Sequence, residues 1–230
     1  MNIPSFYKNK KILITGHSGF KGAWLYFFLK QFGSDVCGYS LQPNDNQNTL
    51  FRALSLHHDE QSTYNDIRDL EKLNNFVKSY NPEILFHLAA QPLVIDSHKD
   101  PLKTLTTNII GTANIIEVVR NTNSIKSTII ITSDKCYENL NDKREFKESD
   151  QLGGIDPYSA SKSCAEIVAN SYRECFFDKN AKGLATARAG NVIGGGDFSA
   201  NRLIPDLIKA IINNHTLQIR NPSATRPWQH

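Results

Sequence analysis

A short strand-like run followed by three glycines most constrains what this chain can fold into. Residues 11–15 read Lys-Ile-Leu-Ile-Thr, and the next residues carry glycine in the spacing Gly-x-x-Gly-x-x-Gly. Apolar side chains then recur at helical spacing over residues 20–32, and Gly33 is a typical helix end. Three glycines alone also suit an ordinary turn, but between a strand and a helix they predict a dinucleotide site. The loop residues expected to bind the cofactor are Gly16, Ser18, Gly19, Phe20, Lys21 and Gly22.

Strand and helix patterns go on alternating along the chain. Further strands are expected at residues 36–39, 84–88, 128–132 and 184–188, and further helices at residues 69–80, 101–120 and 157–177. Such alternation builds βαβ units with helices on both faces of a parallel sheet. We therefore predict an α/β fold with a doubly wound parallel sheet of Rossmann type. Trp24, Phe27 and Phe28, on one face of the first helix, are expected in its core.

The domain organisation follows from this pattern. We expect a dinucleotide-binding domain over residues 1–190 and the beginning of a smaller substrate-binding domain over residues 191–230. The chain stops without a closing helix or a polar tail, so we expect the natural protein to be longer.

Composition and charge indicate a soluble cytoplasmic protein. The formal net charge of +3, from 26 basic and 23 acidic residues, is too small to argue for a nucleic-acid or anionic-membrane partner. The N-terminus lacks the apolar core of a signal peptide, and no apolar run is long enough to span a membrane. The cysteines include no Cys-x-x-Cys pair, so we expect reduced thiols and no metal site. They are Cys37, Cys136, Cys164 and Cys175.

The position that usually separates NAD from NADP is uninformative here. An acid at the end of the second strand would bind the ribose of NAD, but this stretch reads Tyr39-Ser-Leu-Gln42 and has no basic residue either. Asp66 follows a short third strand. It is equally consistent with a group that receives the adenine amino group and with a helix N-cap.

A tyrosine and a lysine carry the expected chemistry. Tyr158 and Lys162 are four residues apart on a predicted helix and share one face. A lysine ammonium beside a phenol favours the phenolate and lowers its pKa, and the lysine can also bond the nicotinamide ribose. This spacing is common by chance. The glycine loop upstream and the polar strand end Ser133-Asp134-Lys135 favour an active site, because open α/β sheets bind ligands at the carboxyl ends of their strands.

Together these motifs resemble the extended short-chain dehydrogenase/reductases. The motifs are Gly16-x-x-Gly19-x-x-Gly22, Asp66-Ile67, His87-Leu88-Ala89-Ala90-Gln91, Tyr158-x-x-x-Lys162 and Arg188-Ala-Gly-Asn191-Val. More specific blocks, at residues 16–24, 132–137, 190–197 and 226–230, resemble the CDP-glucose branch of the nucleotide-sugar 4,6-dehydratases. The resemblance runs from Lys11 to the last residue and implies NAD as cofactor. It adds Asp66, Ile67, Leu88, Ala89, Ala90, Tyr158 and Lys162 to the expected cofactor contacts.

The resemblance also implies roles in a redox-neutral loss of water from CDP-glucose, giving CDP-4-keto-6-deoxyglucose. Tyr158 takes the proton of the sugar 4-hydroxyl with support from Ser133, and Asp134 protonates the leaving 6-hydroxyl. Lys135 stands where the dTDP-glucose branch carries Glu. It is the base at C5, a stabiliser of the enolate, or a salt-bridge partner without a chemical role. The expected substrate contacts are Gln91, Ser133, Asn191, Arg202 and Arg226, whereas His87 is expected to be a core histidine.

Two other kinds of function stay open. The first is another enzyme on the same fold, either a dehydratase of a different nucleotide sugar or a nucleotide-sugar 4-epimerase. The epimerase would also use Tyr158, Lys162 and Ser133, but it has no need for an acid and a base directly after that serine. A dinucleotide-binding module without turnover is the second. The resemblance further implies a homodimer through the helices at 101–120 and 157–177, and a place in making the CDP-linked dideoxyhexoses of bacterial surface polysaccharides.

Overall fold

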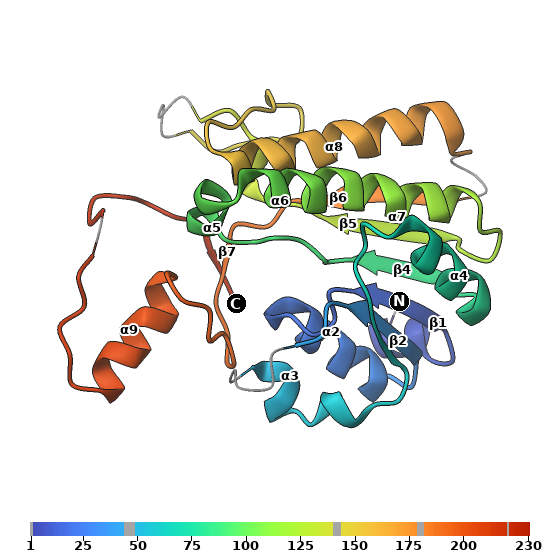
Figure 1. Ribbon diagram of the computed structural model, residues 1–230, viewed down its shortest axis with the longest axis horizontal. Helices are drawn as coiled ribbons and strands as arrows, with labels where there is room; N and C mark the ends of the chain where they lie inside the picture. Colours follow the sequence, from blue (N-terminus) through green and yellow to red (C-terminus); the bar gives the residue numbers. More distant parts are fainter. Residues whose placement is uncertain (1, 44–48, 140–143, 179–181, 220) are drawn as a thin grey trace.

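A six-stranded parallel sheet forms the centre of the protein (Figure 1). The computed structural model describes residues 2–43, 49–139, 144–178, 182–219 and 221–230. The strand order is β3-β2-β1-β4-β5-β6, which reverses direction beside β1 and confirms the predicted doubly wound sheet. The strands are β1 (Lys11–Thr15), β2 (Asp35–Ser40), β3 (Ser62–Tyr64), β4 (Ile84–His87), β5 (Ser127–Ile131) and β6 (Gly183–Ala187).

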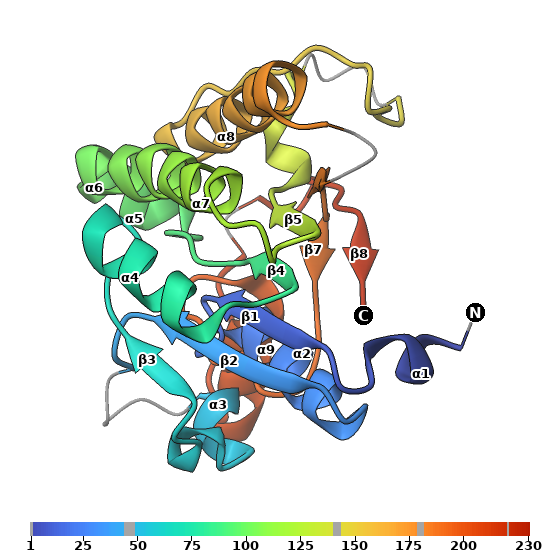
Figure 2. The same ribbon diagram turned by 90° about the vertical axis from the view of Figure 1, so that its right-hand side faces the viewer.

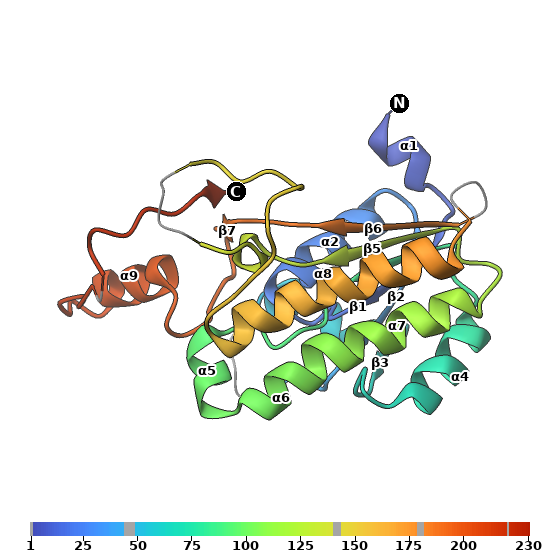
Figure 3. The same ribbon diagram turned by 90° about the horizontal axis from the view of Figure 1, so that it is seen from above.

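Helices cover both faces of this sheet (Figures 2 and 3). Successive side chains of a strand point to opposite faces, so Ile12 and Ile14 pack with α2 while Leu13 packs with α4 and α7. The helix α8 lies beside α6 and α7 on the second face. The helices of the two layers are α2 (Phe20–Gln31), α3 (Leu50–Ala53), α4 (Leu70–Tyr80), α5 (Val94–Lys99), α6 (Pro101–Leu105), α7 (Gly111–Arg120) and α8 (Pro157–Phe176). Shorter elements are α1 (Ile3–Tyr7), η1 (Leu56–His58), η2 (Thr106–Ile110) and η3 (Asp134–Cys136).

The predicted core face of α2 is wrong. The helix buries Gly22, Ala23, Tyr26 and Leu29 instead. Of the three aromatic residues expected in the core, Phe28 is 47% exposed. Trp24 is partly buried against Leu50 and Phe51, and its Nε1 donates a hydrogen bond to Gly195 O at 3.0 Å. Small residues occupy the face of α2 that is turned to the sheet, because the first turn of this helix packs closely on the backbone of the glycine loop.

Residues after the sheet form a separate group of elements. The strands β7 (Asn191–Val192) and β8 (Trp228–Gln229) pair in parallel, and α9 (Leu203–Ile212) stands apart from the helical layers (Figure 1). Within the described residues, no helix combines the length and apolarity that crossing a membrane requires.

Candidate functional site

The glycine loop connects β1 to α2 in a turn that side chains would block. Gly16 has a φ of +73°, and a Cβ there would lie 2.6 Å from Ala89 N. A Cβ on Gly22 would lie 2.1 Å from Gly16 O, so both positions require glycine. Gly19 is the N-cap of α2, whose first N–H groups therefore open onto this loop. Free N–H groups at the start of a helix, reached through a glycine turn, are a typical binding site for a pyrophosphate.

Two side chains tie the glycine loop to its surroundings. Ser18 Oγ lies 2.9 Å from Ser40 Oγ, at the end of β2 where the ribose-binding acid was missing from the sequence. The charge of Lys21 is close enough to that of Lys162 to lower the pKa of the latter. The loop and the predicted Tyr/Lys pair therefore lie in one electrostatic site.

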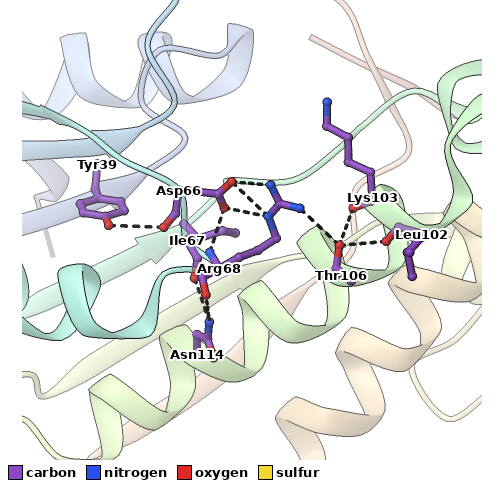
Figure 4. Close-up of polar contacts among 8 residues, drawn as sticks. All are labelled: Tyr39, Asp66, Ile67, Arg68, Leu102, Lys103, Thr106 and Asn114. Atoms are coloured by element: carbon purple, nitrogen blue, oxygen red, sulfur yellow. Dashed lines mark hydrogen bonds and ion pairs between the residues drawn. The ribbon is translucent and has the colours of Figure 1, made fainter.

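Asp66 forms a compact ion pair with Arg68 (Figure 4). Its carboxylate accepts hydrogen bonds from Arg68 N at 2.9 Å and from Arg68 Nη2 at 2.6 Å, and these contacts hold its pKa below the usual value. The N-cap of α4 is Asp69, which accepts from Lys72 N, so the N-cap interpretation of Asp66 is wrong. Ile67 points its side chain at Gly111 of α7, and Asn114 Nδ2 donates to Ile67 O at 3.0 Å.

The segment after β4 rests on a buried histidine. His87 lies between Thr15 Oγ1 at 2.6 Å and Thr112 Oγ1 at 3.1 Å, and burial lowers its pKa to about 3. His87 is thus the core histidine that we expected. Ala89 N donates to Thr15 Oγ1 at 3.3 Å, which brings Leu88, Ala89 and Ala90 alongside the glycine loop.

Gln91 is held by groups of its own segment and of α6. Its Oε1 accepts from Leu93 N at 2.5 Å, and its Nε2 donates to Leu93 O and to Thr104 Oγ1. The side-chain amide expected to meet the substrate is therefore occupied in fixing this turn.

Asn108 is a residue that the sequence reasoning missed. It lies in η2, a π-helical turn that interrupts the long helix predicted at 101–120. Its side chain bonds both Gln91 N and Gln91 O and donates to Ser161 Oγ at 2.8 Å. A buried asparagine on the inner stripe of a helix was the available signal, because such an amide must find partners.

The polar segment after β5 gathers three predicted residues. Ser133 Oγ lies 3.0 Å from Asp134 Oδ1 and accepts from Lys135 N at 3.2 Å. Lys135 Nζ forms an ion pair with Asp134 Oδ2 at 3.1 Å. The salt bridge considered for Lys135 is therefore present, between the two residues to which acid and base roles were assigned.

Tyr158 and Lys162 lie one turn apart near the start of α8, where Asp156 caps the helix by accepting from Ser159 N. Both side chains are buried. Burial raises the pKa of Tyr158, and a hydrogen bond with Ser133 acts in the opposite direction. The expected lowering of this pKa is wrong in this structure because burial outweighs the hydrogen bond with Ser133. Lys162 Nζ donates a hydrogen bond to Ile131 O at 3.3 Å. Burial, with Lys21 nearby, lowers the pKa of Lys162 to about 8.

The predicted substrate residues do not all meet. Arg202 Nη1 pairs with Asp197 Oδ2 at 3.0 Å, and its charge influences Tyr158. Arg226 is exposed and donates to Thr225 O, in a hollow that Asp134 and Lys135 also line. Asn191 is half-buried in β7, where its backbone pairs with Pro227 O.

Comparison with known proteins places the chain in a family. Residues 13–230 match the GDP-mannose 4,6 dehydratase family. The chain belongs to this family. Its membership and its sheet confirm the predicted resemblance and fold.

Relatives in this family include two sugar-nucleotide dehydratases. The chain is 46% identical over 231 residues to CDP-glucose 4,6-dehydratase of Salmonella typhimurium, covering 98% of this chain and 64% of that protein. It is 29% identical to dTDP-D-glucose 4,6-dehydratase of Dictyostelium discoideum, covering 89% of this chain and 49% of that protein. The chain thus spans less than two thirds of the length of these relatives.

Solved structures share the fold. The epimerase Mth375 of Methanothermobacter thermautotrophicus superposes with a TM-score of 0.84 at 25% identity, covering 99% of this chain and 66% of that one. A dTDP-glucose 4,6-dehydratase of Streptomyces venezuelae with bound NAD has a TM-score of 0.81 at 22% identity, covering 95% and 67%.

Proposed function

We propose that the protein is an NAD-dependent nucleotide-sugar 4,6-dehydratase that converts CDP-glucose to CDP-4-keto-6-deoxyglucose and water. The observation that carries this proposal is the meeting of Ser133, Asp134 and Tyr158 at the end of β5 and the start of α8. The similarity to the Salmonella CDP-glucose enzyme supports the choice of sugar nucleotide.

The glycine loop fits a dinucleotide, because both Gly16 and Gly22 lack room for a side chain. NAD, when bound, supplies an acceptor and later donor for one hydride. The loop residues would hold its phosphates, Asp66 and Ile67 its adenine, and Tyr158 and Lys162 its nicotinamide end. The segment at Leu88, Ala89 and Ala90 would line the same groove. NAD rather than NADP is supported by Ser40 at the end of β2, since no basic residue stands there to take a 2′-phosphate.

The proposed proton transfers use the residues of the second half of the site. Tyr158 takes the proton of the sugar 4-hydroxyl, and Ser133 stabilises the phenolate by hydrogen bonding. Oxidation at C4 makes the proton at C5 more acidic. Lys135 either removes this proton or stabilises the enolate that its loss creates. Asp134 gives a proton to the 6-hydroxyl, which leaves as water. The hydride taken from C4 then adds at C6 and a proton returns to C5, which gives the 4-keto-6-deoxy product. The ion pair between Asp134 and Lys135 keeps these two groups side by side, and a proton must pass from Lys135 to Asp134 before Lys135 can act as a base and Asp134 as an acid.

The remaining assignments concern the whole protein. We place Asn191, Arg202 and Arg226 at the substrate diphosphate and Gln91 at the edge of the sugar site, with residues 191–230 as the beginning of a substrate domain. Free thiols at all four cysteines support a cytoplasmic location. Exposed apolar residues on α6 and α8 support a homodimer. A product with a 4-ketone suits the making of deoxyhexoses for surface polysaccharides.

Mass spectrometry tests the reaction. The protein is incubated with NAD and CDP-glucose, and with dTDP-glucose and GDP-mannose in parallel. We expect a product lighter by one water from CDP-glucose alone. An isomer of unchanged mass would favour the epimerase, and NAD binding without any new product would favour a binding module.

A further inference from the structure

Glu166 is a buried carboxylate that the proposed reaction does not use. It lies on α8 one turn beyond Lys162, and its side chain is 4% exposed. A buried charge is costly unless it is paired and hydrogen-bonded, so its partners define its purpose.

Three partners from two strands and their ends converge on Glu166. Thr132 Oγ1 donates to Oε1, while Thr186 Oγ1 at 2.8 Å and Arg188 Nη2 at 2.9 Å donate to Oε2. Burial alone raises the pKa of a carboxyl group. Here the hydrogen bonds from Arg188, Thr132 and Thr186 outweigh burial and hold the pKa of Glu166 below its usual value. Glu166 is therefore an ionised group that joins α8 to the ends of β5 and β6.

Two successive turns of α8 are fixed to the end of β5. Lys162 bonds Ile131 O, and Glu166 bonds the hydroxyl of Thr132, the next residue. Thr132 directly precedes Ser133, and Tyr158 lies one turn before Lys162. Tyr158 and Ser133, which share a hydrogen bond, thus come from α8 and from the end of β5. The contacts of Lys162 and Glu166 connect these two elements.

Arg188 extends this connection to the segment after β5. Its guanidinium also donates to Glu148 O at 3.1 Å and stacks 4.9 Å from the ring centre of Tyr137. Asp134 N donates to Ala189 O at 3.0 Å, so the chain beside Arg188 holds Asp134 as well.

We propose that Glu166, bound to Thr132 and Arg188, is a positioning residue that sets the register between Tyr158 and Ser133 for proton transfer. The inference rests on the proposed function of that pair. A shift of about 1 Å in such a register costs roughly a hundredfold in rate without changing how the substrate is held.

The chain offers a closely matched control for testing this role. Thr132→Val removes the hydroxyl that reaches Glu166 and keeps the shape of the side chain. Thr128→Val makes the same change four residues earlier, within β5, at a buried hydroxyl that has no hydrogen-bond partner among the described residues. Thr132→Ser keeps the hydroxyl, and Glu166→Gln removes the charge. All four variants are compared with the parent in kcat, KM for CDP-glucose, the dissociation constant for NAD and thermal midpoint.

We expect Thr132→Val and Glu166→Gln to lower kcat by at least about tenfold, with KM and NAD affinity little changed. Thr132→Ser restores most of the loss, and Thr128→Val behaves as the parent. A kcat for Thr132→Val equal to that of Thr128→Val overturns the proposal. So does a loss confined to thermal stability.

A second readout separates this inference from the proposed function. The titration of Lys162 is followed by NMR on protein labelled at lysine, with Lys162→Arg to assign the signal. Glu166 favours the charged lysine, so Glu166→Gln lowers the pKa of Lys162 and Thr128→Val does not. If the parent does not dehydrate CDP-glucose, the proposed function fails. The titration alone then decides whether Glu166 acts on the Tyr158/Lys162 pair. An unmoved Lys162 signal then rejects the link between Glu166 and the pair.

Discussion

At the scale of single residues, burial opposes the charge state that the proposed reaction needs from Tyr158. Burial raises the pKa of this phenol, and the first group that acts against it is the hydroxyl of Ser133. Activity that depends on the phenolate rises with pH and is lost as the pH falls below the pKa of Tyr158. The hydroxyl of Ser133 therefore sets where this loss begins.

We predict that Ser133→Ala moves the acid limb of the kcat profile to higher pH and lowers kcat by about 10- to 100-fold at neutral pH. The matched control is Ser124→Ala, which removes a buried hydroxyl that has no hydrogen-bond partner in the described part of the chain. Steady-state kinetics across pH measure both variants. An acid limb unchanged by Ser133→Ala would remove this serine from the ionisation of Tyr158.

His87 makes the folded protein sensitive to acid. Its pKa is about 3 in the folded protein against 6.5 for an exposed histidine. Between these values the unfolded chain binds a proton that the folded protein does not. The contribution of His87 is thus complete above pH 6.5 and is lost as the pH falls towards 3, by up to about 5 kcal/mol.

We predict that His87→Gln flattens the fall in the free energy of unfolding between pH 7 and about pH 4, a window that lies within the shift of this histidine. Urea unfolding at several pH values measures the slope. The exposed His215→Gln serves as control and keeps the parental slope. Equal slopes in parent and His87→Gln would contradict the prediction.

Several residues of the site were within reach of sequence patterns, and others were not. The spacing of Tyr158 and Lys162 is local, so a helix pattern predicts that they share a face. The partners of Glu166 and Asn108 lie on other elements, and only the folded chain brings them together. The direction of the shift at Tyr158 also depends on burial, which spacing does not report.

At the scale of elements, periodicity predicted the strands and long helices but not which side of α2 faces the sheet. Two stripes of α2 have helical spacing, one of small residues with Tyr26 and Leu29 and one of large aromatic residues. Close packing on the glycine loop selects the stripe with Gly22 and Ala23. The apolar pattern also did not predict the π-helical turn η2, because one extra residue in a single turn changes the spacing of apolar residues too little to be seen.

The same packing makes Gly22 a sensitive position of the βα unit. Gly22→Ala forces its methyl group onto Gly16 O, so the loop and the start of α2 must separate. We predict a loss of stability of about 1–3 kcal/mol and NAD binding weaker by at least tenfold. Calorimetry measures both effects. Gly183→Ala is the control, because among the described residues a Cβ there meets only Lys126 O, at 3.8 Å. An NAD affinity equal in the two variants would contradict the assignment of the glycine loop as the NAD phosphate site.

At the scale of the whole molecule, the helical layer of α6, η2 and α8 exposes large apolar side chains on its outer face. Leu102 on α6 is 70% exposed, Ile110 at the end of η2 51%, and Ile167 on α8 56%. These helices lie side by side on one face of the sheet (Figure 3). A second copy of the chain that applies the same helices would bury all three residues twice, as a two-fold interface does.

We predict that the double variant Ile110→Glu/Ile167→Glu is monomeric under conditions in which the parent is a dimer, because charges in an apolar interface lose their hydration without gaining partners. Sedimentation velocity over a range of concentrations measures the mass. Phe28→Glu is a matched control, since Phe28 is 47% exposed but lies on α2, on the opposite face of the sheet. A parent that sediments only as a monomer would reject the interface. A Phe28→Glu variant that dissociates while Ile110→Glu/Ile167→Glu stays dimeric would move the interface to the face of α2.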